Sequence, residues 1–162
     1  MKVLVVDDEK DMQTLFEQRF RKEIREGLVE FAFAFSGEDA ITYLNAIGMN
    51  NVRQHEKETV TYALSALHER YGNDITIHGP TDPEVRGATL SFKFKDVHPH
   101  DLSQVLDQSN ICVRAGHHCA KPLMRLLGAN ATARASFYLY NSLDDVDALV
   151  NALEGAGDLF SL

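Results

Sequence analysis

The residues best suited to chemistry surround one cysteine in the segment ICVRAGHHCAKPLM. Cys119 lies within five residues of four side chains that could carry positive charge: Arg114, His117, His118 and Lys121. Nearby cations favour the thiolate, which is the nucleophilic form of cysteine. Metal binding by the His-His-Cys triplet is less favoured, because adjacent residues rarely reach one ion together. A purely structural cysteine beside two histidines is the alternative that the residues alone leave open.

Two further groups could bind ligands. Arg134, in TARASFYLYN, offers a planar fork that matches a carboxylate. Asp7 and Asp8 follow the apolar run KVLVV, so their oxygens are placed to hold Mg²⁺ at the end of a strand. The alternative for this pair is two solvated acids with no ligand.

The composition narrows the class of protein. With 44% hydrophobic and 25% charged residues, the 162-residue chain has globular composition. The formal net charge of −8 argues against a nucleic-acid partner, and no apolar run is long enough for a membrane span. Two cysteines are too few for a disulfide framework, and no leader pattern is visible, so we expect a cytoplasmic protein.

Periodicity predicts a strand–helix–strand–helix order for residues 1–44. An apolar strand over 2–6 is followed by an amphipathic helix over 9–26 and a strand over 28–35 that alternates phenylalanine with smaller or charged residues. Ser36 has the type and position of an N-cap for the next helix. Short connections favour a parallel βαβ unit.

The pattern changes in NAIGMNN, residues 45–51. The predicted elements beyond it are helices over 52–71, 99–106, 122–127 and 143–153, and strands over 75–78, 88–94, 111–115 and 132–138. Cys112 lies within the apolar strand ICV, so we expect it to be buried, whereas Cys119 lies in an exposed loop.

The motifs LVVDDEK and SGEDAITYL resemble the first half of a response-regulator receiver domain. The resemblance implies a flavodoxin-like βαβα fragment in which Asp7 and Asp8 help to hold Mg²⁺. The chain contains no recognisable third strand ending in the phosphorylated aspartate after Leu44, so we expect only weak Mg²⁺ binding.

Residues from about 40 to 153 resemble the small C-terminal domain of SufS-type cysteine desulfurases, in the class V aminotransferase-like family. The motifs are GMNNVRQHE, IHGP, VHPHD, ICVRAGHHCAKPLM and TARASFYLYN. By this resemblance Cys119 is the persulfide nucleophile, Arg134 and Arg114 bind the substrate, and His100 contacts a sulfur-acceptor scaffold protein.

The same resemblance implies pyridoxal phosphate in the parent enzyme, held by a lysine that follows a histidine. None of the seven lysines in these 162 residues follows a histidine, so we expect no cofactor and no desulfurase turnover. Pyridoxal phosphate and Mg²⁺ thus belong to the two parent families.

Taken together, the two resemblances predict an α/β chimera, with a receiver-like fragment over 1–44 and a desulfurase-like small α+β domain over 45–162. The shared helix AITYL, residues 40–44, favours deliberate recombination over a natural gene fusion. The main interpretation is a chimera without catalytic activity; the alternative is residual persulfide transfer through Cys119, and signalling is a third reading. A homodimer through the phenylalanine-rich strand is expected if that strand stays uncovered.

Overall fold

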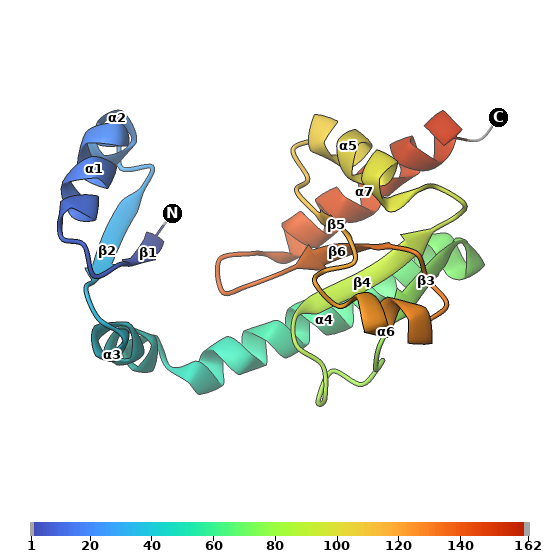
Figure 1. Cartoon of the computed structure of the whole chain (residues 1–162), viewed down its shortest axis with the longest axis horizontal. Coiled ribbons are helices and arrows are strands. Elements are labelled where there is room, and N and C mark those ends of the chain that lie inside the picture. Colours follow the sequence, from blue (N-terminus) through green and yellow to red (C-terminus); the bar gives the residue numbers. More distant parts are fainter. Residues whose placement is uncertain (1, 161–162) are drawn as a thin grey trace. The chain divides into compact units, whose positions relative to one another are not determined.

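A computed structural model describes residues 2–160 of the chain, with side chains up to residue 157. The chain divides into two compact units, Met1–Arg53 and Gln54–Leu162 (Figure 1). The division falls inside helix α4, Met49–Tyr71, nine residues beyond the boundary predicted from the motifs. The compact units show which residues pack together, but they do not show where each segment originated. The boundary predicted after residue 44 therefore stays a prediction.

The first unit has the predicted strand–helix–strand–helix order. Its elements are β1 (Lys2–Val6), α1 (Asp11–Arg19), α2 (Arg21–Arg25), β2 (Glu30–Ala34) and α3 (Gly37–Ile47). The two strands pair in parallel, with Val3 opposite Phe31 and Val5 opposite Phe33. The predicted parallel unit is therefore confirmed.

The helix expected over residues 9–26 is not continuous. It is interrupted at Phe20, whose backbone (φ −107°, ψ 23°) leaves the helical region between α1 and α2. The Phe20 ring lies 5.9 Å from the Phe16 ring and 5.4 Å from the Phe31 ring, measured between centroids. The break therefore coincides with a contact between the helices and the sheet, which periodicity along the chain does not reveal.

Helix α3 begins and ends at the residues that local chemistry favours. The hydroxyl of Ser36 accepts a hydrogen bond from the Asp39 amide at 3.1 Å, which confirms the predicted N-cap. The helix ends at Gly48, whose φ of 89° favours glycine, and α4 begins at the next residue. The predicted break over 45–51 is thus a single glycine.

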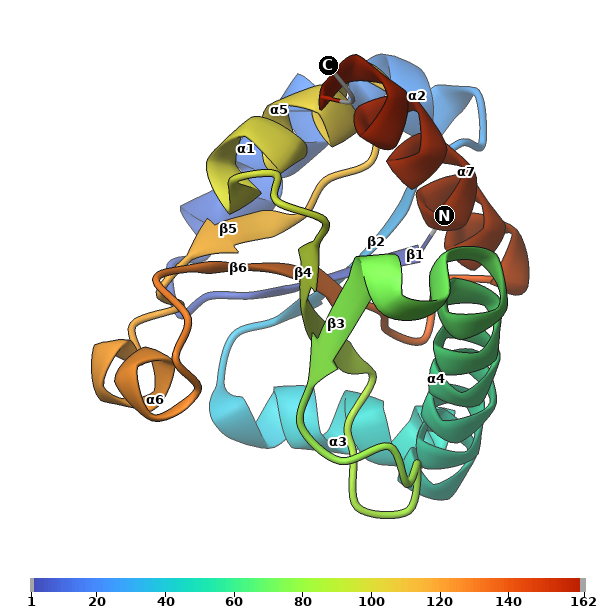
Figure 2. The same cartoon turned by 90° about the vertical axis from the view of Figure 1, so that its right-hand side faces the viewer.

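The second unit is a four-stranded antiparallel sheet with helices (Figures 1 and 2). After α4 and a short 3-10 turn its elements are β3 (Ile75–His78), β4 (Thr89–Phe94), α5 (Pro99–Gln108), β5 (Arg114–Gly116), α6 (Lys121–Leu126), β6 (Thr132–Ser136) and α7 (Leu143–Phe160). The strands lie in the order β3-β4-β6-β5, and the order of elements agrees with the prediction.

The core of the second unit lies on one face of this sheet. Alternate residues of β4 are completely buried, and helices α4, α5 and α7 supply the rest of the apolar layer. The main contributors are Leu90, Phe92 and Phe94 of β4, Leu102 and Leu106 of α5, Val146, Leu149 and Leu153 of α7, and Val60 and Leu67 of α4.

Strand β5 starts three residues later than predicted, and this overturns the expectation for Cys112. Cys112 is exposed, in irregular chain before the strand. Its neighbours Ile111 and Val113 pack against the core, so the side chain between them points outward.

In the described residues, no helix is long and apolar enough to cross a membrane.

Candidate functional site

Cys119 lies on a tight turn between β5 and α6. The Ala120 amide donates to the His117 carbonyl at 2.8 Å, and the two residues between them, His118 and Cys119, have φ values of 54° and 61°. Positive φ at both central positions is the pattern of a type I′ turn. Cys119 is exposed, as predicted.

Arg114 contacts the sulfur of Cys119 directly. Its Nη2 lies 3.6 Å from Cys119 Sγ, within the range of a hydrogen bond to sulfur. The guanidinium therefore places a positive charge and a hydrogen-bond donor next to the sulfur. The sequence-based expectation of a cation beside Cys119 is therefore met by Arg114.

Arg134 is brought to the same place by strand pairing. Arg114 of β5 and Arg134 of β6 are register partners, so both side chains project from one face of the sheet. This face is opposite the one on which Ala133 and Ala135 join the core. In the described part of the chain neither arginine forms an ion pair, and Arg134 Nε is buried without a hydrogen-bond partner. Two guanidinium groups without a carboxylate partner thus project from one face of the sheet, and one of them contacts a thiol, which is an arrangement suited to an anion.

His118 differs from its neighbour His117. His117 is exposed, whereas the His118 ring is half-buried and its Nε2 lies 2.9 Å from the hydroxyl of Thr132, which is fully buried. Burial lowers the pKa of His118, and the charge of Arg134 lowers it further. The lowered pKa of His118 argues against this residue as one of the positive charges expected around Cys119. Nothing in the sequence pattern indicated Thr132.

His100 lies close to the beginning of this turn. It is in the first turn of α5, where its amide donates to His98 Nδ1 at 3.3 Å and the two rings stack at 5.4 Å. Its Nε2 would lie 3.7 Å from a Cβ placed on Gly116, three residues before Cys119. The fold therefore brings His100 near the candidate site, and its contact with a partner stays a prediction.

Asp7 and Asp8 belong to the other unit. Asp7 Oδ1 accepts from the Glu9 amide at 2.9 Å, and the Asp7 amide donates to the Ala34 carbonyl at 3.1 Å, so this acid shapes the turn after β1. Among the side chains of residues 2–157, no three from acids, histidines or cysteines are arranged to hold a metal ion. Mg²⁺ binding by the pair stays a prediction.

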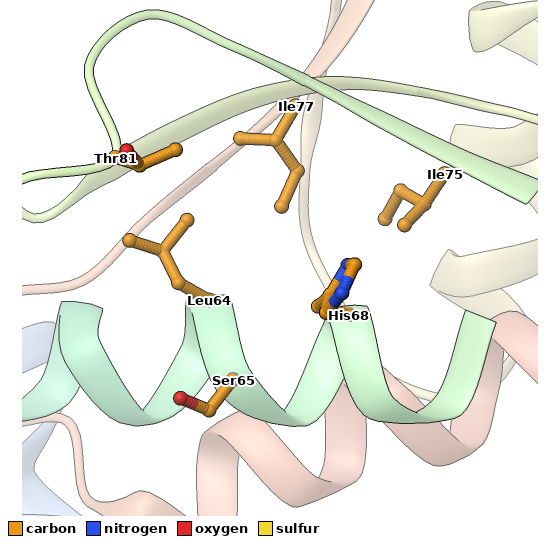
Figure 3. Close-up of a pocket in the computed structure, with 6 residues that line it drawn as sticks. All are labelled: Leu64, Ser65, His68, Ile75, Ile77 and Thr81. Carbon is orange, nitrogen blue, oxygen red and sulfur yellow. The ribbon is translucent and has the colours of Figure 1, made fainter. Parts of the chain in front are cut away.

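An apolar groove of about 410 Å³ lies at the opposite edge of the sheet from Cys119. Figure 3 shows Leu64, Ser65 and His68 of α4 on one side, and Ile75 and Ile77 of β3 with Thr81 on the other. Strand β3 is one edge of the sheet and β5 the other, so this groove is separate from the candidate site.

The comparisons with known proteins identify the family. The model of the aminotransferase class-V family matches residues 8–149, so the chain belongs to that family. The "Probable cysteine desulfurase" of Halalkalibacterium halodurans is 49% identical over 121 residues, and that of Streptomyces coelicolor is 50% identical over 121 residues. These matches cover 75% of this chain but only 29% and 28% of the relatives, so the chain spans less than a third of their length.

Solved structures give the same result. A cysteine desulfurase from Thermococcus onnurineus NA1 matches with a TM-score of 0.70 and 34% identity, over 75% of this chain and 30% of that one. The cysteine desulfurase CsdA from Escherichia coli matches with a TM-score of 0.66 and 34% identity, over 75% and 29%. The mixed α/β fold is therefore shared with cysteine desulfurases.

The comparisons support only one of the two predicted resemblances. They bear out the class V, desulfurase-like part, and nothing in them shows a receiver segment, a flavodoxin-like fusion or a chimera. The family match already begins at residue 8, within the segment for which a receiver origin was predicted.

The family implies pyridoxal phosphate in the parent enzymes. This group needs a lysine amine for covalent attachment together with a phosphate-binding cradle. Three lysines are in ion pairs with carboxylates, Lys2 with Glu30, Lys57 with Glu84 and Lys95 with Asp74, and no lysine of the chain has the histidine context. The residues of this chain do not fit the cofactor.

Proposed function

We propose that Cys119 accepts sulfur from a persulfide donor and passes it to an acceptor thiol. The observation that carries the proposal is the 3.6 Å contact between Arg114 Nη2 and Cys119 Sγ on an exposed turn. The cysteine desulfurase relatives support this resemblance to sulfur-transfer proteins. The interpretation as a chimera without activity has less support than this alternative.

The chemistry balances without an oxidant. The Cys119 thiolate attacks the terminal sulfur of a persulfide R–S–SH. A new S–S bond forms on Cys119, the S–S bond of the donor breaks, and its electron pair leaves on R–S⁻, which takes a proton from water. Attack by an acceptor thiolate on the Cys119 persulfide repeats the exchange in the opposite sense.

The two arginines select the donor. A persulfide derived from an amino acid carries a carboxylate, and the fork of Arg134 can bind it while Arg114 stays beside the sulfur. Desulfurase turnover on free cysteine is not proposed, because the residues of this chain do not fit pyridoxal phosphate.

The acceptor is a protein thiol that docks near His100. His100 lies against Gly116, at the start of the Cys119 loop, so a partner that contacts this histidine would present its thiol close to Cys119. A cytoplasmic setting, which keeps thiols reduced, suits the exchange. A homodimer through the phenylalanine-rich strand β2 is a further proposal, and the half-buried rings of Phe31 and Phe33 support it.

The test is persulfide loading followed by intact-mass spectrometry. The protein is incubated with cysteine persulfide, and we expect the mass of one sulfur atom to be added on Cys119 and removed by dithiothreitol. Cys119→Ala should abolish the addition, and Cys112→Ala is the matched control that should keep it, since both cysteines are exposed. Equal loading of the two cysteines would contradict the proposal.

A receiver origin of residues 1–44 is kept as a separate hypothesis. The parallel β1–β2 pair and the Ser36-capped helix α3 support it. Weak Mg²⁺ binding that is lost in Asp7→Asn with Asp8→Asn, and no phosphoaspartate after treatment with acetyl phosphate, are expected. Phosphorylation of an aspartate would show that the segment works as a receiver, which the main proposal does not include.

A further inference from the structure

The backbone of the Cys119 turn is unusual for the residues that form it. His118 and Cys119 are consecutive, neither is glycine, and both are in the left-handed region. Non-glycine residues rarely adopt this conformation, and where they do, the surrounding structure must hold them. Some contact outside the turn must therefore stabilise it.

The contact that reaches the turn from the sheet is made by His118. Gly116, the last residue of β5, pairs with Thr132 of β6. Two residues later the chain has turned back, and His118 Nε2 lies 2.9 Å from Thr132 Oγ1. This hydrogen bond thus links the turn to the end of the β5–β6 ladder. Its partner, Thr132, is fully buried.

The surroundings of the ring favour its neutral form. His118 Nδ1 is buried and has no hydrogen-bond partner among the described residues, so a proton there would have no acceptor. The charged groups that face the ring are Arg134 of β6, Arg114 of β5 and His117 of the turn, and all three oppose a further positive charge. Burial is the largest cause of the lowered pKa of His118, and only a hydrogen bond to the backbone of Thr132 raises it.

We propose that His118 is a positioning residue: as a neutral imidazole bonded to Thr132, it holds the turn so that Cys119 Sγ faces Arg114. Protonation of His118 places a positive charge on a half-buried ring near Arg134 and Arg114, so it favours release of the ring from Thr132 and lets Cys119 move away from Arg114. The functional meaning of this rests on the proposed sulfur transfer, but the geometry can be tested without it.

The test compares two alkylating reagents on Cys119 in the whole chain. Iodoacetate carries a carboxylate and iodoacetamide does not, so the ratio of their rates reports the positive charge near Sγ and cancels the fraction of thiolate. His118→Ala and the nearly isosteric Thr132→Val should lower this ratio at Cys119 about two- to fivefold, as expected for loss of one exposed charge contact. His117→Ala is the matched control, and the ratio at Cys112 is the internal reference in every variant.

A pH series supplies a second readout. In the wild type the ratio at Cys119 should fall as the pH decreases through the His118 titration followed by NMR, and the His118 midpoint should lie below the ordinary histidine value of about 6.5. In Thr132→Val the ratio should stay low at every pH. Because Thr132→Val changes the hydroxyl alone, it remains informative if His118→Ala fails to fold.

Unchanged ratios in both variants would overturn the proposal, as would a ratio in the wild type that does not change with pH. If the ratio is lower in the two variants but the wild type takes up no sulfur from persulfide, the positioning role is kept and the sulfur transfer is rejected. If the wild type takes up sulfur but the ratios in the variants are unchanged, the sulfur transfer is kept and the positioning role is rejected.

Discussion

The two units of the chain bury their apolar residues to very different extents. Within the described residues, the buried hydrophobic side chains of the first unit are Ala34 and Val52, and helices α1, α2 and α3 contain none. The second unit has a continuous core in which Phe92, Phe94 and Leu102 are completely buried. Both units show clear amphipathic patterns, so pattern alone does not explain the difference.

The number of packed strands and layers explains it. The first unit has two strands, and its rings, such as Phe16 against Phe31 at 5.4 Å, are only half-buried. A two-stranded sheet is marginal by itself, whereas a four-stranded sheet covered by helices can exclude water. We infer that the second unit supplies most of the stability, and the following predictions test this.

The largest effect is expected from Phe92→Ala in β4. Phe92 is completely buried, so truncation should lower the free energy of unfolding by about 3–5 kcal/mol. The matched change in the first unit is Phe31→Ala, which should cost about 1 kcal/mol because its ring is half-buried. Urea unfolding measures both; equal losses would remove the contrast between the units.

A second large effect is expected at Arg86, a buried cation of the second unit. Its guanidinium donates to the carbonyls of His78 and Pro80, and its Nε donates to that of Thr89 at 3.2 Å. Arg86→Ala should lower the free energy of unfolding by roughly 2 kcal/mol, because charge-assisted bonds are lost from a buried position. Urea unfolding and proteolysis of the loop from Gly79 to Ala88 report the change.

The control for Arg86 is an arginine on the surface of the same unit. Arg70 pairs with Glu154, and both side chains are about half exposed, so Arg70→Ala should leave the free energy of unfolding almost unchanged. Arg86→Lys should recover little, because an ammonium cannot reproduce the planar fork. Full recovery by lysine would show that charge alone matters there.

A smaller effect is expected at the N-cap of α3 in the first unit. Ser36→Ala removes the acceptor of the Asp39 amide and should destabilise the helix by about 1 kcal/mol. Hydrogen exchange of the α3 amides measures this loss of helix stability locally. Global unfolding is less suitable, because it reports mainly the second unit. Ser36→Asn should restore protection, and unchanged exchange in Ser36→Ala would argue against the cap.

The smallest effect is a pH dependence confined to the second unit. Burial lowers the pKa of His78, the charge of Lys93 lowers it further, and its Nε2 is buried without a partner in the described residues. The folded state thus binds this proton less well than the unfolded state, whose pKa is about 6.5. The free energy of unfolding is therefore higher while His78 is neutral in both states, above pH 6.5. It decreases as the pH falls from 6.5 through the lowered pKa of His78 in the folded state.

Hydrogen exchange over this pH range separates the two units. All seven histidines follow residue 54, so exchange in the first unit should not change with the histidine titration. His78→Gln should flatten part of the dependence in the second unit, and His118 accounts for another part. An identical slope in His78→Gln and in the wild type would exclude His78 as a source.

Most secondary structure could be predicted from the chain, because its causes are local. The alternation of β4, the Ser36 cap and the glycine after α3 act within a few residues. The errors arose where a distant contact decides the outcome. Phe20 interrupts a helix where it meets Phe31, and Cys112 is exposed because only its two neighbours pack on the core.

The candidate site divides in the same way. The sequence by itself indicated Cys119 as the candidate nucleophile and predicted a cation near it, because Arg114 and Cys119 are five residues apart on one strand and turn. Only the tertiary structure decided that Arg134 is paired with Arg114 across the sheet and that His118 is half-buried against Thr132, where burial lowers its pKa. Strand register and burial depend on residues far apart in the chain, and no local spacing encodes them.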